Sequence, residues 1–521
     1  MSSAETNAGA GAIDGRTTEE IDALAKGGRT NIIGFVMRLV ARLPFLFIAG
    51  RLYGPDTLGT FARAVLFVEV ASLLATFGLK RGLALAIAES DRPHVQIVWD
   101  CLVVAAIASG FASAILLLLP DLMYHGSAPT LLERLLPCII VAGAWSDIML
   151  AALAYRRNIQ ATVTARAIIE PWTISIAAGL LYPIARHDGL VIAYMLSMVA
   201  ALLASFVPFV RSYGAPAGWR LHIGRTVALI RRNAPLAGAD ALEWGTRNVD
   251  RSILFLMFEP RIVGIYWMAQ QVASIPGKLK TSFDPILGPV ITSSLARGDT
   301  ASVASQVRQV GFWILAAQTG LALMGSIPGE AVMGTVGPQF VAGTAALAFL
   351  LLAEAAASTG AVCESALVYI ARVQNMAISI GMLLFQVGLS YALIYAMQAL
   401  GWPVAYQAAG PAAALFVSVT LTSVIKSNYL ARLLRARVAG WRLPMLWAIL
   451  AAGAVGAAFT ALPPEYEWVE LAIGEPAIAV VYLFVLYRLA FKPEDRALFR
   501  RMPDGVTLPA VGLRASSEGH G

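Results

Sequence analysis

The sequence predicts an all-α polytopic membrane protein with about fourteen transmembrane helices. Apolar residues make up 58% of the 521-residue chain and charged residues only 14%, whereas a soluble domain carries roughly 25% charge. Apolar stretches recur along nearly the whole chain, near the length of roughly 20 residues that a helix needs to cross the hydrocarbon. The basic residues gather in alternate connecting segments, as in a chain that crosses a membrane repeatedly.

The expected spans form two six-helix lobes and a C-terminal pair. The first lobe comprises residues 31–210, the second residues 236–425, and the pair residues 444–490. The seventh span is the most polar and the least evident from hydropathy. The individual spans are expected at 31–49, 58–77, 97–119, 135–155, 168–185, 189–210, 236–258, 265–290, 309–327, 344–370, 374–398, 405–425, 444–462 and 468–490.

The segments outside the spans orient the chain. Residues 211–235 and 426–443 are basic connectors, and within the second one the Tyr429 to Trp441 stretch predicts an interfacial amphipathic helix. The tails 1–30 and 491–521 are polar, and we expect the first to be disordered. Because Lys and Arg mark cytoplasmic loops, both termini are expected in the cytoplasm. The net charge of +7 then reflects loops beside anionic lipid rather than nucleic-acid binding.

A short pattern occurs twice with identical spacing, which indicates an internal repeat. Its first copy is Arg42, Pro55, Gly59, Phe61 and Ala64, and its second is Arg247, Pro260, Gly264, Tyr266 and Ala269. Both copies run from one span into the next, and an even number of spans separates them. The two lobes are therefore expected to be parallel repeats about an axis along the membrane normal, an arrangement found in transporters.

Arginine and lysine inside the expected spans are candidates for anion binding. Each such charge costs ~2.5–3.5 kcal/mol in hydrocarbon on insertion scales, so a lipid-facing position is disfavoured. Arginine suits phosphate because its planar fork donates two parallel hydrogen bonds. The set comprises Arg38 and Arg42 in span 1, Arg63 in span 2, Arg247 and Arg251 in span 7, and Lys278 in span 8.

Acidic residues in the spans offer either coupling sites or ion-pair partners. Buried carboxylates can carry a coupling proton or Na⁺, and the candidates are Asp240, Glu243, Asp250, Glu354 and Glu364. The alternative in span 7 is structural pairing, as Glu243–Arg247 or Arg247–Asp250. Glu354 and Glu364 could equally be solvated near an interface. Lys278 could equally extend its amine to the interface. Asp147 is interpreted as a solvated group near an interface.

No cofactor is expected. The five histidines and three cysteines show no metal-ligand spacing, and the cysteines lie in apolar segments. No Walker A motif is present, which favours coupling to a Na⁺ gradient, a proton gradient or the membrane potential over ATP hydrolysis.

Several segments of the chain resemble polysaccharide transporters of the MOP flippase superfamily. The resemblance is carried by residues 50–61, 77–81, 248–251, 263–266, 282–289 and 293–299. It is closer to Wzx-type O-antigen and exopolysaccharide flippases than to drug-extruding relatives. The resemblance implies a two-lobe flippase, without enzymatic activity, in the bacterial inner membrane. It would move undecaprenyl-diphosphate-linked oligosaccharides to the periplasmic leaflet for lipopolysaccharide or exopolysaccharide synthesis.

The resemblance also implies site residues and partners. Arg38, Arg42 and Arg63 are similar in position to cavity arginines of related lipid II flippases, whereas the transfer to Arg247 and Arg251 is weaker. A polysaccharide polymerase and chain-length machinery would be partners.

Two other functions remain open. A MATE-like cation-coupled drug exporter would favour a carboxylate-dominated cavity. A membrane polymerase or ligase would favour a large periplasmic loop, whereas the expected outer loops are short.

Overall fold

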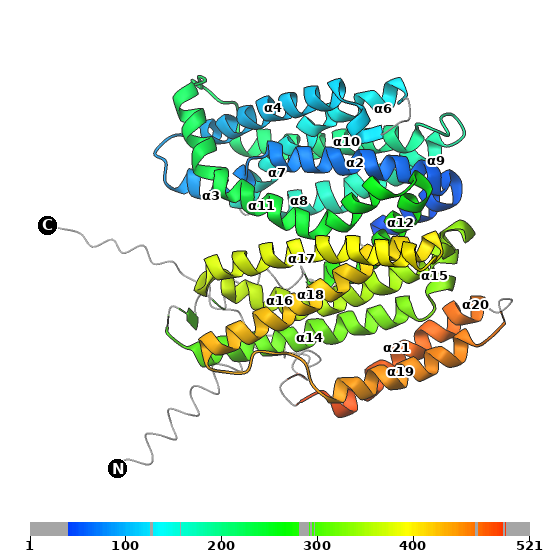
Figure 1. Cartoon of the computed structure of the whole chain (residues 1–521). Coiled ribbons are helices and arrows are strands. Elements are labelled where there is room, and N and C mark those ends of the chain that lie inside the picture. Colours follow the sequence, from blue (N-terminus) through cyan, green and yellow to red (C-terminus); the bar gives the residue numbers. More distant parts are fainter. Residues whose placement is uncertain are drawn as a thin grey trace, which may run out of the picture.

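The structure of the protein is a computed structural model that describes residues 40–124, 129–156, 158–280, 291, 294–295, 297–463, 467–492 and 495. Every regular element among these residues is a helix, and no strand occurs among them. The all-α prediction is therefore confirmed for the described part of the chain. Figure 1 shows long helices that lie roughly alongside one another, with α11 and α12 next to the N-terminal helices. We group the helices by the lobe in which the sequence predicts them.

The first group contains the helices expected in the N-terminal lobe. A helical stretch from residue 40 continues into the π-helix η1 (Ala49–Tyr53) and into α2 (Gly54–Ala75). The remaining helices are α3 (Leu79–Ala88), α4 (His94–Leu118), α5 (Asp121–Tyr124), α6 (Leu131–Leu135), η2 (Leu136–Ile139), α7 (Ile140–Tyr155), α8 (Ile159–Thr162), η3 (Val163–Ile169), α9 (Glu170–Leu181) and α10 (Gly189–Tyr213). Helices α4 and α10 pack against α7, and α9 packs against α10.

The second group contains the helices expected in the C-terminal lobe. These are α11 (Ile223–Met257), α12 (Pro260–Lys280), α14 (Thr300–Ser326), α15 (Gly329–Val336), η4 (Pro338–Gly343), α16 (Thr344–Ile370), α17 (Arg372–Ala399) and α18 (Val404–Leu434). Helix α16 packs between α14 and α18. Helix α11 contacts α2, α3 and α4 as well as α17 and α18, so it joins the two groups.

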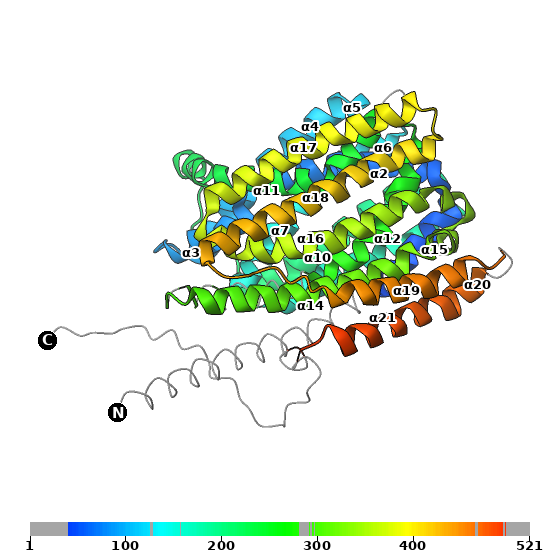
Figure 2. The same cartoon turned by 60° about the horizontal axis from the view of Figure 1, so that its bottom comes forward.

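A third set of helices closes the chain. Helices α19 (Pro444–Thr460) and α21 (Glu475–Leu489) pack against each other and against α14, with α20 (Glu467–Val469) and η6 (Glu470–Gly474) between them. Both views place this pair at the edge of the molecule beside α14 (Figures 1 and 2). One end of the pair is fixed by Arg442, which precedes α19 and whose Nη1 lies 2.5 Å from Oδ2 of the fully buried Asp495.

The described helices are those of a multi-pass membrane protein. Eight of them are long and apolar enough to cross a bilayer, and the bent pair α14–α15 would make a ninth. Helix α11 falls outside this set because it carries the run of charges expected in span 7. The total of about fourteen spans stays a prediction.

Two expected connectors differ from the structure. The 211–235 connector is irregular only from Gly214 to His222, and its second half forms the first turns of α11. Gly214 and Gly218 end α10 and shape this turn, because both adopt positive φ. The amphipathic helix expected over Tyr429 to Trp441 is wrong, since α18 continues to Leu434 and ends at the left-handed Arg435.

The two copies of the sequence repeat contact each other. A Cβ on Gly59 of α2 would lie 1.7 Å from the carbonyl oxygen of Pro260, and one on Gly264 of α12 would lie 1.9 Å from that of Pro55. Only glycine permits so close a crossing of two helices. Reciprocal contacts between equivalent positions are expected for elements related by a two-fold axis, as the repeat predicts.

Candidate functional site

A cavity of about 370 Å³ lies between the first group of helices and α11. Five ionisable side chains line it: Glu69 from α2, Asp147 from α7, Arg166 from η3, Glu170 from α9 and Arg251 from α11. Tyr194, Trp244 and Asn248 add polar and aromatic surface. We call this space the central cavity.

Arg166 holds two of the cavity's carboxylates. Its guanidinium lies 2.5 Å from Asp147 and 2.8 Å from Glu170, and Lys80 lies 3.4 Å from Asp147. Asp147 is thus an ion-pair partner in a cavity rather than the solvated interfacial group expected. Arg166 falls between the spans expected at 135–155 and 168–185, so hydropathy predicts it in a connecting segment. Its position in the π-helix η3, an irregularity frequent at functional sites, is not visible from hydropathy.

Arg251 is the least satisfied cation of the central cavity. Its side chain is only 10% exposed, and its Nη2 lies 3.9 Å from Oε2 of Glu69. The same guanidinium donates to Asn248, while its Nε has no hydrogen-bond partner among the described residues. A buried guanidinium with an unused donor is unfavourable unless a ligand completes its hydrogen bonds.

The other predicted arginines lie in different surroundings. Arg63 is half-buried on α2, less than two turns before Glu69, and its Nε also lacks a partner within the described structure. Arg42 is exposed, and the exposed Arg247 pairs with Glu243 at 2.9 Å, at the i+4 spacing that the sequence offered. Arg38 lies outside the described residues. Lys278 lies in α12, but its side chain is not among those described.

Asp250 accepts hydrogen bonds from α12 rather than from Arg247. The fully buried carboxylate accepts a 2.6 Å bond from the Tyr266 hydroxyl and a 3.3 Å bond from Gln270. Its Oδ1 has no partner among the described residues. The alternative Arg247–Asp250 pair is therefore absent from the described structure. An acid with one unused oxygen is placed to take up a proton or a cation.

Asp240 and Glu243 take part in ion pairs that join the two groups of helices. Arg81 of α3 lies 2.7 Å from Asp240 and 2.5 Å from Glu243, both on α11. Arg232 of α11 pairs with Glu89 at the end of α3. We call these residues the α3–α11 clasp. It lies at the end of the molecule that carries the basic loops.

Glu354 and Glu364 do not line the central cavity. Glu364 of α16 lies 3.1 Å from Nζ of Lys426, a nearly fully buried amine that also donates to Ser379 at 3.0 Å. Glu354 is half-buried on α16, with its carboxylate beside the backbone of Gly277 in α12. The structure therefore places the five predicted acids in four different surroundings.

Comparison with known proteins identifies a family. The model of a family described as polysaccharide biosynthesis proteins matches residues 48–319. A search of curated proteins gives no significant match.

Several solved structures have a similar fold. The lipid II flippase MurJ, in an inward closed conformation, matches with a TM-score of 0.65 over 88% of this chain and 99% of its own, at 12% identity. An inward-facing multidrug resistance MATE transporter of the MOP superfamily matches with a TM-score of 0.60 over 77% of this chain and 98% of its own, also at 12% identity. A MATE transporter of Vibrio cholerae matches at 0.55 and 13% identity, over 80% and 98%. At these identities the likeness concerns the fold.

Proposed function

The chain belongs to the family of polysaccharide biosynthesis proteins, and we propose that it acts there as a flippase for undecaprenyl-diphosphate-linked oligosaccharides. It would carry each unit from the cytoplasmic to the periplasmic leaflet of a bacterial inner membrane, for lipopolysaccharide or exopolysaccharide synthesis. Both termini would lie in the cytoplasm, and a polymerase with its chain-length machinery would take the product.

The observation that carries the proposal is the incompletely bonded Arg251 in a cavity beside the helix that joins the two groups. The diphosphate of the substrate offers the acceptor oxygens that this guanidinium lacks, and a planar guanidinium binds such oxygens in pairs. Arg63 of α2 would add a second cation, because its Nε also lacks a hydrogen-bond partner among the described residues. Arg42 and Arg247 are exposed and do not line the cavity, so they would meet the headgroup outside it. The sequence prediction adds Arg38 and Lys278, whose side chains lie outside the described part of the structure.

The polyprenyl tail does not need to enter the protein. The central cavity of about 370 Å³ is near the lower limit of small-molecule sites, so in this conformation it admits part of a headgroup. The tail would stay in the bilayer while the sugar passes between the lobes. The α3–α11 clasp would have to open for the headgroup to enter from the cytoplasm.

Uphill transport needs a coupled driving force, and Asp250 is the candidate coupling group. Its unused oxygen and its bond from Tyr266 would let a proton or Na⁺ change the interaction between α11 and α12. Asp240 and Glu243 pair with Arg81 in the clasp, and Glu354 and Glu364 lie outside the central cavity. We therefore rank these four acids below Asp250 as coupling groups.

The proposal is tested with single arginine variants in a flippase-null cell. Arg251→Ala and Arg63→Ala are expected to reduce surface polysaccharide at least tenfold, as for the loss of a charge-assisted hydrogen bond of about 1.5–3 kcal/mol. Arg220→Ala, an exposed arginine outside the cavity, is the matched control. Full complementation by Arg251→Ala and by Arg63→Ala, at normal protein levels, would remove these arginines from the mechanism.

A cation exporter of the same fold is a second candidate, because three carboxylates and two arginines line the central cavity. Arg166 and Lys80 pair with Asp147 and Glu170, and Arg251 faces Glu69, so each of these three carboxylates has a basic partner. Transport in proteoliposomes separates the two functions. A flippase is expected to move a fluorescent polyprenyl-diphosphate sugar but not ethidium, and the reverse result would favour the exporter.

A further inference from the structure

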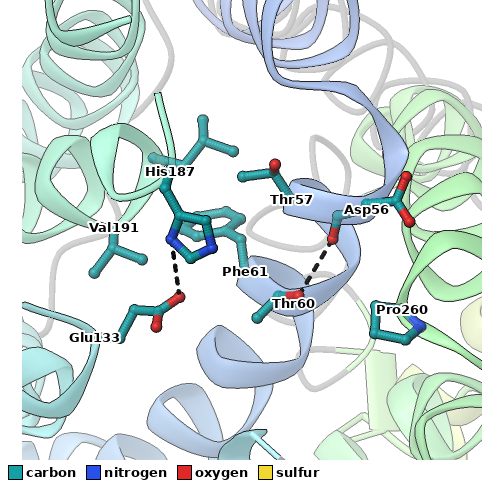
Figure 3. A pocket seen from close by; sticks show the side chains of 9 residues that line it. Asp56, Thr57, Thr60, Phe61, Glu133, His187, Val191 and Pro260 are labelled. Carbon is teal, nitrogen blue, oxygen red and sulfur yellow. Dashed lines mark hydrogen bonds and ion pairs between the residues drawn. The ribbon is translucent and has the colours of Figure 1, made fainter. Parts of the chain in front are cut away.

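A second pocket lies near the opposite end of α2 from the clasp. It has a volume of about 270 Å³ and lies between the first turns of α2, the α6 segment and the turn before α10. Its polar lining comprises Asp56, Thr57, Thr60, Glu133 and His187. Figure 3 shows the two threonines facing Glu133 and His187 across the space, with Phe61 behind. We call it the outer pocket, because it lies away from the end with the basic loops, which the sequence predicts to be cytoplasmic.

Glu133 is held in place by bonds that leave one of its oxygens available. Its Oε2 accepts a 2.8 Å bond from the backbone N–H of Thr130, and its backbone carbonyl accepts a 2.9 Å bond from the hydroxyl of Tyr124. The residue is only 5% exposed. Its Oε1 lies 3.9 Å from Nδ1 of His187, beyond hydrogen-bond distance. Among the described residues, no group donates a hydrogen bond to Oε1, so this buried carboxylate presents an acceptor to the pocket beside His187.

The lining indicates a ligand that brings hydroxyl groups. No lysine or arginine is among the described residues that line the pocket, so a diphosphate has no counter-charge there. Carboxylates accept hydrogen bonds, while threonine and histidine both donate and accept them. Val191 and Pro260 add apolar surface, which suits the C–H face of a sugar ring. The volume lies just below the usual range for small-molecule sites, so one ring is the fitting size.

We propose that the outer pocket binds one sugar residue of the transported headgroup through its hydroxyl groups. This inference rests on the proposed flippase function and adds to it a sugar site separate from the diphosphate site. Pro260 belongs to α12, and the other named lining residues belong to the N-terminal helices. The ligand would thus lie against the seam where the two copies of the repeat cross. A sugar bound there would be held at the outer end while the two lobes change from the inward-open to the outward-open conformation.

A metal ion is the competing occupant. One ligand atom each from Glu133, His187 and Asp188 lies within 4.8 Å of the others. However, Thr130 donates to Oδ1 of Asp188 at 2.9 Å and to Oε2 of Glu133. Nδ1 of His187 also lies 3.2 Å from Oδ1 of Asp188. These hydrogen bonds hold the three residues together without a cation between them, so we favour a hydrogen-bonding wall.

The test measures sugar binding directly. Full-length protein in nanodiscs is mixed with glucose, galactose, mannose or N-acetylglucosamine, and saturation-transfer NMR reports the bound sugar. At least one sugar is expected to give a signal. Glu133→Gln should weaken the apparent affinity about tenfold, as for a lost charge-assisted hydrogen bond, and Thr57→Phe should abolish the signal by filling the pocket. Glu259→Gln, an exposed acid beside Pro260, should leave it unchanged.

Each other result overturns the inference. No signal from any of the four sugars, or a signal that survives both pocket variants, would remove the sugar site. Mn²⁺ binding that is lost in Glu133→Gln, without any sugar signal, would assign the pocket to a cation. Thr57→Phe removes no hydrogen bond that holds Glu133, so a folding defect in Glu133→Gln leaves the test intact.

The sugar site and the flippase function fail separately. Arg251→Ala should stop flipping in proteoliposomes and keep the sugar signal. Flipping by the wild-type protein without pocket-dependent sugar binding would refute only this inference. Pocket-dependent sugar binding without any flipping would refute only the proposed function.

Discussion

Removing Arg81 should open the molecule at the end that carries α3. In the α3–α11 clasp this guanidinium bonds Asp240 at 2.7 Å and Glu243 at 2.5 Å. The Asp240 side chain is only 4% exposed, and its second oxygen has no partner among the described residues. Arg81→Ala would therefore leave a buried carboxylate without its cation.

The size of the effect follows from these exposures. A buried charged acceptor left unpaired costs roughly 1–3 kcal/mol. Glu243 is half-exposed and keeps Arg247, so its lost pair adds at most about 0.5 kcal/mol. A destabilisation of about 1–3.5 kcal/mol would shift the ratio of closed to open conformations by roughly 5–300-fold, at tenfold per 1.4 kcal/mol.

Spin-label distances measure this opening. Labels on cysteines at the exposed positions Ala88 and Arg231 report the separation of α3 and α11, after the exposed Cys138 is replaced by serine. Arg81→Ala should add a longer distance to the distribution. Lys80→Ala is the matched control, because Lys80 pairs with Asp147 inside the first group of helices. An Arg81→Ala distribution identical to that of the wild type would refute the role of the clasp.

Three further perturbations have definite expected outcomes. Gly59→Ala should lower the free energy of unfolding by about 1–3 kcal/mol through overpacking. Gly381→Ala is the control, because nothing lies within 4 Å of its added Cβ. Equal melting temperatures of the two variants would contradict the close crossing. Asp250→Asn should leave the protein folded but make flipping in vesicles insensitive to collapse of the coupling gradient. Flipping that stays as sensitive as in the wild type would exclude Asp250 as the coupling group. Arg442→Ala should leave the buried Asp495 without its cation, at a cost of roughly 3–5 kcal/mol. The α19–α21 pair should then become accessible to limited proteolysis. An unchanged digestion pattern would show that other contacts hold the pair in place.

Local patterns predicted the helices and the charged face of α11, because apolar periodicity and i+4 spacing act within one helix. The Glu243–Arg247 pair is an example of such a local interaction. Partners that are distant in sequence could not be predicted in this way. The hydroxyl that binds Asp250 comes from the next helix, and the amine that pairs with Glu364 comes from α18.

The depth of a charged side chain within the helical bundle is a second property that the sequence did not predict. Arg166 lies just before the span expected at 168–185, so the span boundaries predict it in a loop. The structure continues the helix from Ile159 through η3 into α9, which carries the guanidinium to the cavity. The positive-inside rule counts charges near span ends, so it does not distinguish a loop arginine from one that turns inward.

The bare crossing of α2 and α12 has a mechanical consequence. At Gly59 and Gly264 two backbones touch with no side chain between them to interlock. Such a contact resists separation but offers little resistance to rotation, in the manner of a scissor joint. It lies towards the end opposite α3 (Figure 1), so a small swing about it becomes a wide displacement where the clasp residues meet.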